Sequence, residues 1–219
     1  MNRRSVVAAL GAAATLGPAL PALAQSGPVS LSFAGTPLGG LPTDFMTART
    51  GKGAAAEWKV VEDPTVAAGR VLAQTSTDRT DYRFPLAIYQ PLTATNVAVS
   101  VRFKAVAGEI DRAAGIAVRL TDPNNYYVVR ANALEGNVNL YRVVQGNRSL
   151  IHGVRHKVPS NEWHRLGLRL GGDRFTVSFD GAELFTVADR SLTGDGKVAL
   201  WTKADSVTRF DALTLQGLP

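Results

Sequence analysis

Apolar and polar residues alternate through most of the chain from residue 57 onward. In the segment 96–104, three valines and Phe103 occupy every second position, with Ala, Ser, Arg and Lys between them. Side chains of an extended strand point to opposite faces in turn, so this period of two predicts strands with one buried and one solvated face. The same alternation returns in five further segments: 116–120, 166–170, 175–179, 198–200 and 207–215.

Turn-forming residues separate these segments. Asp180-Gly181 and Gly146-Asn147 are typical of hairpin tips, and Gly171 to Asp173 separates two further strands. No stretch after residue 24 shows the period of an amphipathic helix. We therefore predict an all-β fold: a single antiparallel β-sandwich of jelly-roll type, formed by residues 25–219 as one domain. Residues 35–56 are rich in Gly, Thr, Pro and Ala, and are predicted to form a long loop with one helical turn at 44–47.

The first 24 residues have the pattern of a secretory signal peptide. Arg3-Arg4 is followed by an apolar run and then by Ala22-Leu23-Ala24, a typical cleavage site. The arginine pair fits a twin-arginine signal as well as the ordinary secretory route, and both stay open. The pattern predicts a periplasmic or secreted protein with no membrane span once the signal is removed.

Composition narrows the chemistry. The chain has 219 residues and no cysteine, which excludes disulfides, thiolate metal sites and cysteine nucleophiles. It has 24 basic and 18 acidic residues, without a basic run, so nucleic acid is not an expected partner. No serine-hydrolase elbow, phosphate-binding loop, dinucleotide fingerprint or zinc motif occurs.

Several local strings are recognisable together. The most specific are Asn124 to Asn132 (NNYYVVRAN) and Gly196 to Asp205 (GKVALWTKAD), and Glu162-Trp163-His164 lies between them. Their order and spacing resemble the concanavalin A-like lectin/glucanase superfamily, and in particular bacterial exported domains similar to 3-keto-disaccharide hydrolase and laminin-G-like domains. The resemblance covers about residues 40–219. It implies two curved antiparallel sheets, with any glycan on the concave sheet or its rim.

One strand carries side chains suited to a sugar. Alternation places Tyr126, Arg130 and Asn132 on the face opposite the core, with Arg119 on the preceding strand and Glu135 and Asn137 at the following turn. An aromatic ring stacks on a sugar, while guanidinium and amide groups form hydrogen bonds with hydroxyls. The alternative is an ordinary outer face whose arginine pairs with an acid across the sheet.

Trp201 and Lys203 lie on the polar side of a later strand, and a tryptophan there suits a sugar platform or fills a groove under the 35–56 loop. Trp58 and Trp163 are interpreted as structural. The predicted ligand-binding residues are Arg119, Tyr126, Arg130, Asn132, Glu135, Trp201 and Lys203.

A catalytic site is less well supported. Gly108 to Asp111 resembles the start of the family-16 glycoside hydrolase motif, but alanines stand where its second glutamate is needed, and retaining hydrolysis requires two carboxylates. The string is predicted to be a solvated turn. The acids in loops are scattered, so we expect no cofactor and no metal, with a calcium ion at the rim as the alternative.

The sequence thus favours an exported, non-catalytic carbohydrate-binding module with a sugar ligand. One alternative is a hydrolase or lyase acting on a modified sugar of the 3-keto type, with Glu135, Asp205 or His164 as base. Another is an envelope module that binds protein. Oligomeric state and ligand identity are not predicted.

Overall fold

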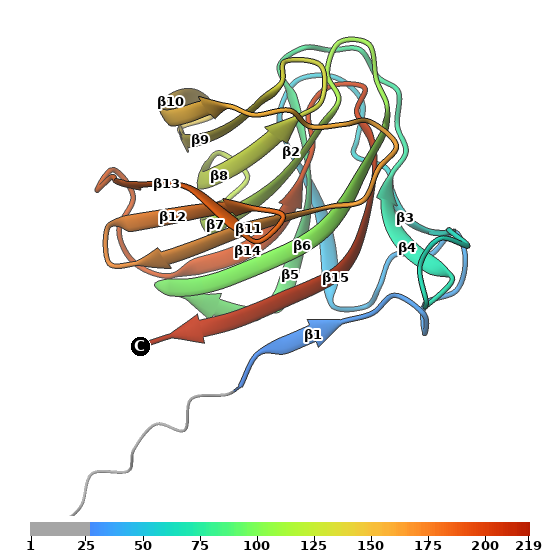
Figure 1. Cartoon of the computed structure of the whole chain (residues 1–219), viewed down its shortest axis with the longest axis horizontal. Helices are drawn as coiled ribbons and strands as arrows, with labels where there is room; N and C mark the ends of the chain where they lie inside the picture. The colour runs from blue at the N-terminus through green and yellow to red at the C-terminus, as the bar shows by residue number, and fades with distance from the viewer. Residues whose placement is uncertain (1–26) are drawn as a thin grey trace, which may run out of the picture.

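The computed structural model describes residues 27–219, so the predicted signal peptide at 1–24 lies outside the described residues. Fifteen strands form two antiparallel sheets stacked face to face, and the described residues contain no helix (Figure 1). The predicted all-β sandwich is confirmed. In residues 27–219 there is accordingly no helix of the length and apolarity needed to cross a bilayer.

Sheet A contains eight strands in the order β13-β12-β11-β6-β15-β4-β3, with β1 pairing beside β15. Its strands are β1 (Val29–Leu31), β3 (Trp58–Glu62), β4 (Arg70–Gln74), β6 (Asn96–Ala107), β11 (His164–Gly171), β12 (Arg174–Phe179), β13 (Ala182–Ala188) and β15 (Val207–Leu218).

Sheet B contains seven strands in the order β10-β9-β8-β7-β14-β5-β2. Its strands are β2 (Phe45–Gly51), β5 (Arg83–Ala94), β7 (Ala113–Asp122), β8 (Asn125–Asn132), β9 (Asn137–Val144), β10 (Asn147–Arg155) and β14 (Gly196–Trp201).

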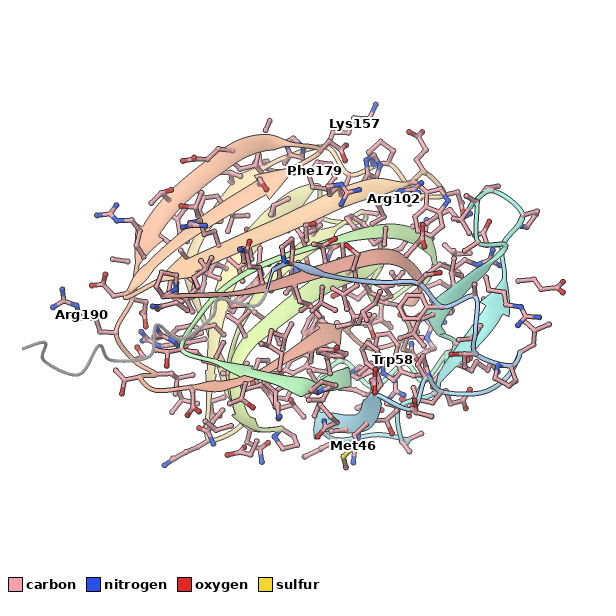
Figure 2. The ribbon with its side chains drawn as sticks, turned by 90° about the horizontal axis from the view of Figure 1, so that it is seen from below. Met46, Trp58, Arg102, Lys157, Phe179 and Arg190 are labelled. Carbon is pink, nitrogen blue, oxygen red and sulfur yellow. The ribbon has the colours of Figure 1, made fainter. Side chains whose placement is uncertain are left out.

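The main core lies between the sheets and follows the alternation of the sequence. Val97, Val99, Val101 and Phe103 of β6 are all buried there, as the segment 96–104 predicts. The rings of Trp58 and Phe210 lie 5.6 Å apart in the same core, so Trp58 is structural. In Figure 2, Trp58 and Phe179 lie within the body of the sandwich, whereas Lys157 and Arg190 extend away from it.

The predicted long loop at 35–56 is wrong in its second half. Residues 45–51 form β2, which pairs along its whole length with β5, and no helical turn occurs at 44–47. Phe45 is buried beside Tyr89, with ring centroids 5.4 Å apart, and this apolar anchor fixes the strand at the edge of sheet B.

Sheet B is curved so strongly that its two halves touch. β10 and β5 are separated by four strands in the sheet order, yet the Arg148 guanidinium of β10 lies 4.8 Å from the Phe84 ring of β5. Tyr82, just before β5, also accepts the Arg148 backbone N–H and donates to the Gly146 carbonyl. The face of sheet B turned away from the core is therefore the inner, concave face of a curl.

Candidate functional site

A second apolar cluster fills the middle of this concave face. Phe84, Tyr126 and Trp201 are fully buried in it, with the Phe84 and Trp201 rings 5.2 Å apart. Trp201 Nε1 donates to the Tyr126 hydroxyl at 3.2 Å, and that hydroxyl lies 2.8 Å from Thr50 Oγ1. Burial raises the pKa of Tyr126 to about 12. The expectation of an exposed aromatic face is therefore wrong for Tyr126 and Trp201.

Arg148 covers this cluster from the edge of the sheet. Its guanidinium lies 4.6 Å from the Tyr141 ring and 6.0 Å from the Trp201 ring, as well as over Phe84. A cation above aromatic faces is attracted by the ring quadrupoles. The rings are thus stacked on one another and on an internal cation, and no ring face is left for a sugar.

Arg130 is also buried, with 1% of its surface exposed. Its Nη2 donates to Glu135 Oε2 and to Asn137 Oδ1, both at 2.7 Å. Burial works to raise the pKa of Glu135, but the hydrogen bonds from Arg130 and Asn137 outweigh it and leave that pKa lowered. Glu135 therefore stays ionised at the rim, in an ion pair with Arg130.

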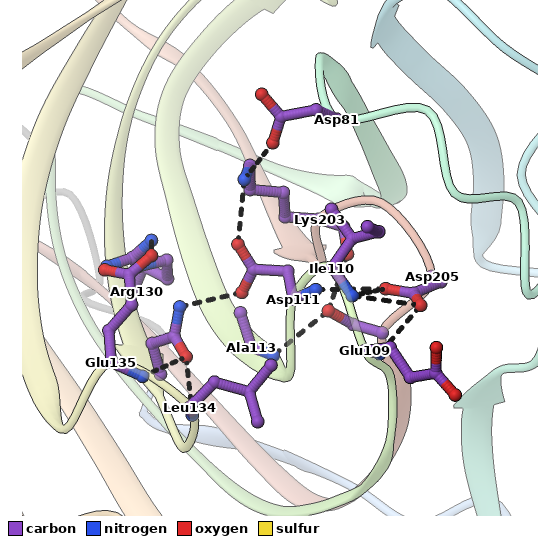
Figure 3. Close-up of polar contacts among 12 residues, drawn as sticks. Asp81, Glu109, Ile110, Asp111, Ala113, Arg130, Leu134, Glu135, Lys203 and Asp205 are labelled. Atoms are coloured by element: carbon purple, nitrogen blue, oxygen red, sulfur yellow. Dashed lines mark hydrogen bonds and ion pairs between the residues drawn. The ribbon is translucent and has the colours of Figure 1, made fainter.

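A second polar chain runs beside this pair. Lys203 Nζ lies 2.5 Å from Asp81 Oδ1 and 3.0 Å from Asp111 Oδ2, and Asn132 Nδ2 donates to Asp111 Oδ1 at 2.8 Å (Figure 3). Asp111 is buried, and burial raises its pKa against the pull of Lys203 and Arg130. The predicted solvated turn is therefore wrong for Asp111, which is buried between Lys203 and Asn132.

The structure brings six of the seven predicted ligand-binding residues to the concave face of sheet B or its rim, but Arg119 lies elsewhere. Arg119 has a left-handed backbone with φ of 48°, at a register shift between β7 and β8. Its guanidinium donates to the carbonyls of Thr95, Leu192 and Gly172, which are not part of that face. Arg119 therefore has a structural role, since it holds three loop carbonyls together. The prediction that it lies beside Arg130 is wrong.

Asp205 fixes the loop that carries Asp111. Its carboxylate accepts the backbone N–H groups of Glu109, Ile110 and Asp111 at 2.7–3.2 Å. Burial works to raise the pKa of Asp205, but these three N–H groups outweigh it and hold the pKa below its usual value. This bond set makes Asp205 a loop anchor, with both oxygens occupied, and not an available base.

We expect Asp205→Ala to lower the free energy of unfolding by about 1.5–3 kcal/mol at pH 7, because a charged acceptor is lost and three N–H groups lose their partner. The lowered pKa means that the stabilisation is present above the ordinary aspartate pKa and is lost as pH falls through the folded value. Urea unfolding at pH 7 and pH 3 checks this. Asp205→Asn, which keeps one acceptor oxygen, is expected to lose less, and an equal loss at both pH values contradicts the account.

The concave face stays open at one end, over β9 and β10. A hollow of about 460 Å³ lies there. It is lined by Glu135, Asn137, Asn139, Leu150, Gly153, Val154 and Arg155. Gly153 leaves room for Asn139, since a Cβ at 153 would come within 1.9 Å of Asn139 Oδ1. Asn139 in turn donates to the Tyr141 hydroxyl at 2.8 Å, so its amide is held in place.

This lining combines a fixed carboxylate, two amides, a guanidinium and an exposed apolar side chain, Leu150. The polar groups of this set can accept hydrogen bonds from the hydroxyls of a sugar and donate hydrogen bonds to them, while Leu150 can pack against an apolar face of the sugar ring. Only Glu135 of the predicted residues lines it. The sequence places Asn137 beside Glu135 at the turn, but it is not among the seven predicted ligand-binding residues. Asn139 and Arg155 were missed, although Asn139 alternates with Asn137 along one strand in the sequence and could have been found from that spacing.

The described residues hold no group of three or more His, Asp or Glu side chains that could bind a metal ion. His164 packs on Phe179 with its ring 5.0 Å away, and its Nδ1 lies 2.8 Å from Asp180 Oδ2. His152 and His156 pack against Phe185 and Phe179. All three imidazoles therefore belong to the packing between strand edges, and none of them lines the hollow.

Residues 87–218 match the family model of the galactocerebrosidase C-terminal lectin domain. Among solved structures, the carbohydrate-binding module CBM66 of Bacillus subtilis is similar, with a TM-score of 0.61 and 18% identity over 80% of this chain and 96% of that one. Domain 4 of a GH43 extracellular arabinanase from Geobacillus stearothermophilus, solved in complex with arabinotriose, has a TM-score of 0.54 and 15% identity over 86% and 90%.

The Bacillus licheniformis β-glucanase has a TM-score of 0.54 and 12% identity, over 87% of this chain and 98% of that one. At these identities the solved structures show the shared fold alone. No curated protein matches the chain by sequence.

Proposed function

Because the chain belongs to the family of galactocerebrosidase C-terminal lectin domains, we propose that it is a carbohydrate-binding module that takes a sugar in the hollow of sheet B. The observation that best supports this proposal is the composition of the hollow, which has a volume of about 460 Å³. Its lining includes the carboxylate of Glu135, the amide of Asn139 and the guanidinium of Arg155. The module CBM66 and the arabinanase domain solved with arabinotriose share this sandwich fold, which supports a sugar as ligand.

The arrangement of the acids supports a non-catalytic module. Glu135 is ion-paired to Arg130, Asp111 is buried against Lys203, and Asp205 is occupied by three backbone N–H groups. A general acid or base needs a carboxyl with free access to the substrate and a pKa near the working pH. Glu135 alone reaches the hollow, and its lowered pKa keeps it from donating a proton. Hydrolysis or lysis of a 3-keto-type sugar is therefore the second choice.

We also propose export, to the periplasm or beyond, from the signal-peptide pattern of residues 1–24. The absence of cysteine is compatible with folding on either side of a membrane, since the domain needs no disulfide. A protein-binding envelope module is the remaining alternative, and a negative glycan screen would favour it.

The test measures sugar binding by residues 25–219 and by Arg155→Ala. A neutral oligosaccharide panel is screened by thermal shift, and each hit is titrated by calorimetry and checked for consumption. Arg155 is exposed and its side chain forms no hydrogen bond or ion pair within residues 27–219, so its loss should leave the melting temperature of the free protein unchanged. We expect affinity for the hit to fall about tenfold or more, since a hydrogen bond to a charged group is worth roughly 1.5–3 kcal/mol.

Lys157→Ala is the matched control, because it removes one exposed cation near the hollow that does not line it. Gly153→Ala is a second probe, since its added Cβ displaces Asn139. Equal affinities of the wild type, Arg155→Ala and Gly153→Ala would overturn this site. Consumption of the sugar would overturn the non-catalytic assignment, and no binding to any glycan would overturn the proposed function.

A further inference from the structure

The solvent face of sheet A has a depression of its own, on the opposite side of the sandwich from the hollow. It has a volume of about 220 Å³ and crosses β12, β11, β6 and β15. Its floor is a row of small residues in register across these strands. Ser178 pairs with Gly167, Gly167 with Ser100, and Ser100 with Thr214. We call this feature the sheet A trough.

The trough exists because the central residue of the row has no side chain. A Cβ on Gly167 would come 2.3 Å from Ser178 Oγ, so that hydroxyl leans over the glycine and no larger residue fits beside it in this arrangement. Ser100, Ser178 and Thr214 are only partly buried. The floor therefore offers three hydroxyls, each able to donate and accept, at a level below the flanking side chains.

Arginines stand on both sides of the floor. Arg165 and Arg169 lie two residues before and after Gly167 on β11, so all three share the solvent face. Both arginines are exposed, and neither forms an ion pair within residues 27–219. Arg165 donates only to Ser100 Oγ, at 3.3 Å. Because neither guanidinium is neutralised by an ion pair, this face has a positive electrostatic potential.

Arg165 also lies directly opposite Arg102 of β6. Like charges at directly opposed positions of an antiparallel pair destabilise a sheet. Arg102 forms an ion pair with Asp211 at 3.1 Å and lies 5.0 Å from the Trp163 ring. The Arg165 guanidinium forms no ion pair within residues 27–219, although the Asp180 carboxylate accepts the backbone N–H of Arg165 at 2.7 Å. Among the acids on neighbouring strands, Glu183 of β13 pairs opposite Ser178 and accepts from Thr186 Oγ1. Arg165 and Arg169, which have no ion pairs and flank a floor of hydroxyls, therefore suit a ligand that brings its own negative charge.

We propose that the sheet A trough is a second binding site, for a polysaccharide bearing carboxylate or sulfate groups. The hydroxyl floor matches sugar hydroxyls, and the guanidinium forks of Arg165 and Arg169 match planar or tetrahedral oxyanions with paired hydrogen bonds. The residues that line the trough include no aromatic side chain, and single-stranded nucleic acid is bound chiefly by stacking on aromatic rings. The site is independent of the hollow in sheet B.

The test compares residues 25–219 with Arg165→Gln/Arg169→Gln and with the charge-matched control Lys52→Gln/Lys157→Gln. Lys52 and Lys157 are exposed and line neither the trough nor the hollow. The probes are polygalacturonate, heparin, neutral dextran and single-stranded oligonucleotide, each at low and moderate salt, with binding measured by biolayer interferometry. Polygalacturonate reports carboxylate recognition, and heparin reports recognition of sulfate together with carboxylate.

We expect at least one acidic polysaccharide to bind, and the double arginine variant to lose about tenfold or more in affinity. The control should lose little, and dextran should not bind. Circular dichroism and the melting temperature of the variant check its fold, which exposed Arg→Gln changes should leave intact. Binding to neither acidic polymer, an equal loss in the lysine control, or equal affinity for the oligonucleotide would overturn the proposal in favour of a generic cationic surface.

Discussion

Replacing Trp201 with alanine is expected to lower the free energy of unfolding by about 3–5 kcal/mol, the usual cost of truncating a large, fully buried aromatic residue. Trp201 is fully buried against Phe84, and its indole N–H donates to Tyr126. The cavity would lie between the floor of sheet B and Arg148, where the two halves of the curl meet. Chemical unfolding followed by far-UV circular dichroism measures this loss.

The same experiment separates a packing residue from a sugar platform. As a control, Trp163→Ala removes a tryptophan that lies partly exposed between Arg102 and Lys104, and we expect it to cost about 1–2 kcal/mol in lost cation–π contacts and area. If Trp201→Ala keeps the stability of the wild type and loses only glycan binding, Trp201 is a ligand platform and the closed concave cluster is wrong.

Lys203→Met is expected to be about as damaging, at about 3–5 kcal/mol near neutral pH, because it leaves the buried Asp111 carboxylate without its counter-charge. Lys203 is itself shielded, with 10% of its side chain exposed. Burial works to lower the pKa of Lys203, but Asp81 and Asp111 outweigh it and leave the pKa raised. Asp81 is largely exposed and contributes little to the loss, since water solvates it when Lys203 is removed.

The pH dependence of this deficit identifies its cause. Burial raises the pKa of Asp111 above its usual value even with Lys203 present, and removing Lys203 raises it further. The folded state then binds a proton more readily than the unfolded state, so stability falls as pH rises between the two values. The deficit from the unpaired carboxylate should vanish below the ordinary aspartate pKa and be complete above the raised one. Urea unfolding from pH 3 to pH 8 measures it.

Asp111→Asn/Lys203→Met is the matched control. The introduced amide would be neutral and could still accept from Asn132, so the double variant should recover most of the stability lost by Lys203→Met at pH 7. A Lys203→Met deficit that is the same at every pH, with no recovery in the double variant, contradicts the buried pair as its source.

The alternation of apolar residues predicts the strands of this fold because one face of each strand packs in a sandwich core. The rule works for β6 and β11, whose inward residues are all aliphatic or aromatic. It fails for β2, whose sequence FMTARTG has one apolar anchor at Phe45 and then mixed residues. That strand forms because β5 offers a free edge for pairing, which is a property of the tertiary structure and not of the segment.

The candidate site shows the limit of the same rule. Alternation correctly assigns Tyr126, Arg130 and Asn132 to one face of β8, but a period of two says nothing about whether that face is open. The curl of sheet B closes it, and the closure depends on contacts between β5 and β10 that lie 64 residues or more apart in the sequence. At Arg119 the register shift interrupts the alternation of the strand. Its side chain therefore does not point to the face that the period of two predicts.

The most direct test of the central claim is an NMR titration of ¹⁵N-labelled residues 25–219 with the sugar that gives the largest thermal shift. Binding in the hollow of sheet B should move the backbone amides of Asn137, Asn139, Gly153 and Arg155 and the side-chain amides of both asparagines, with the Trp201 indole signal unchanged. Shifts centred on Trp201 and Tyr126, or confined to surfaces away from β9 and β10, would contradict the proposed site.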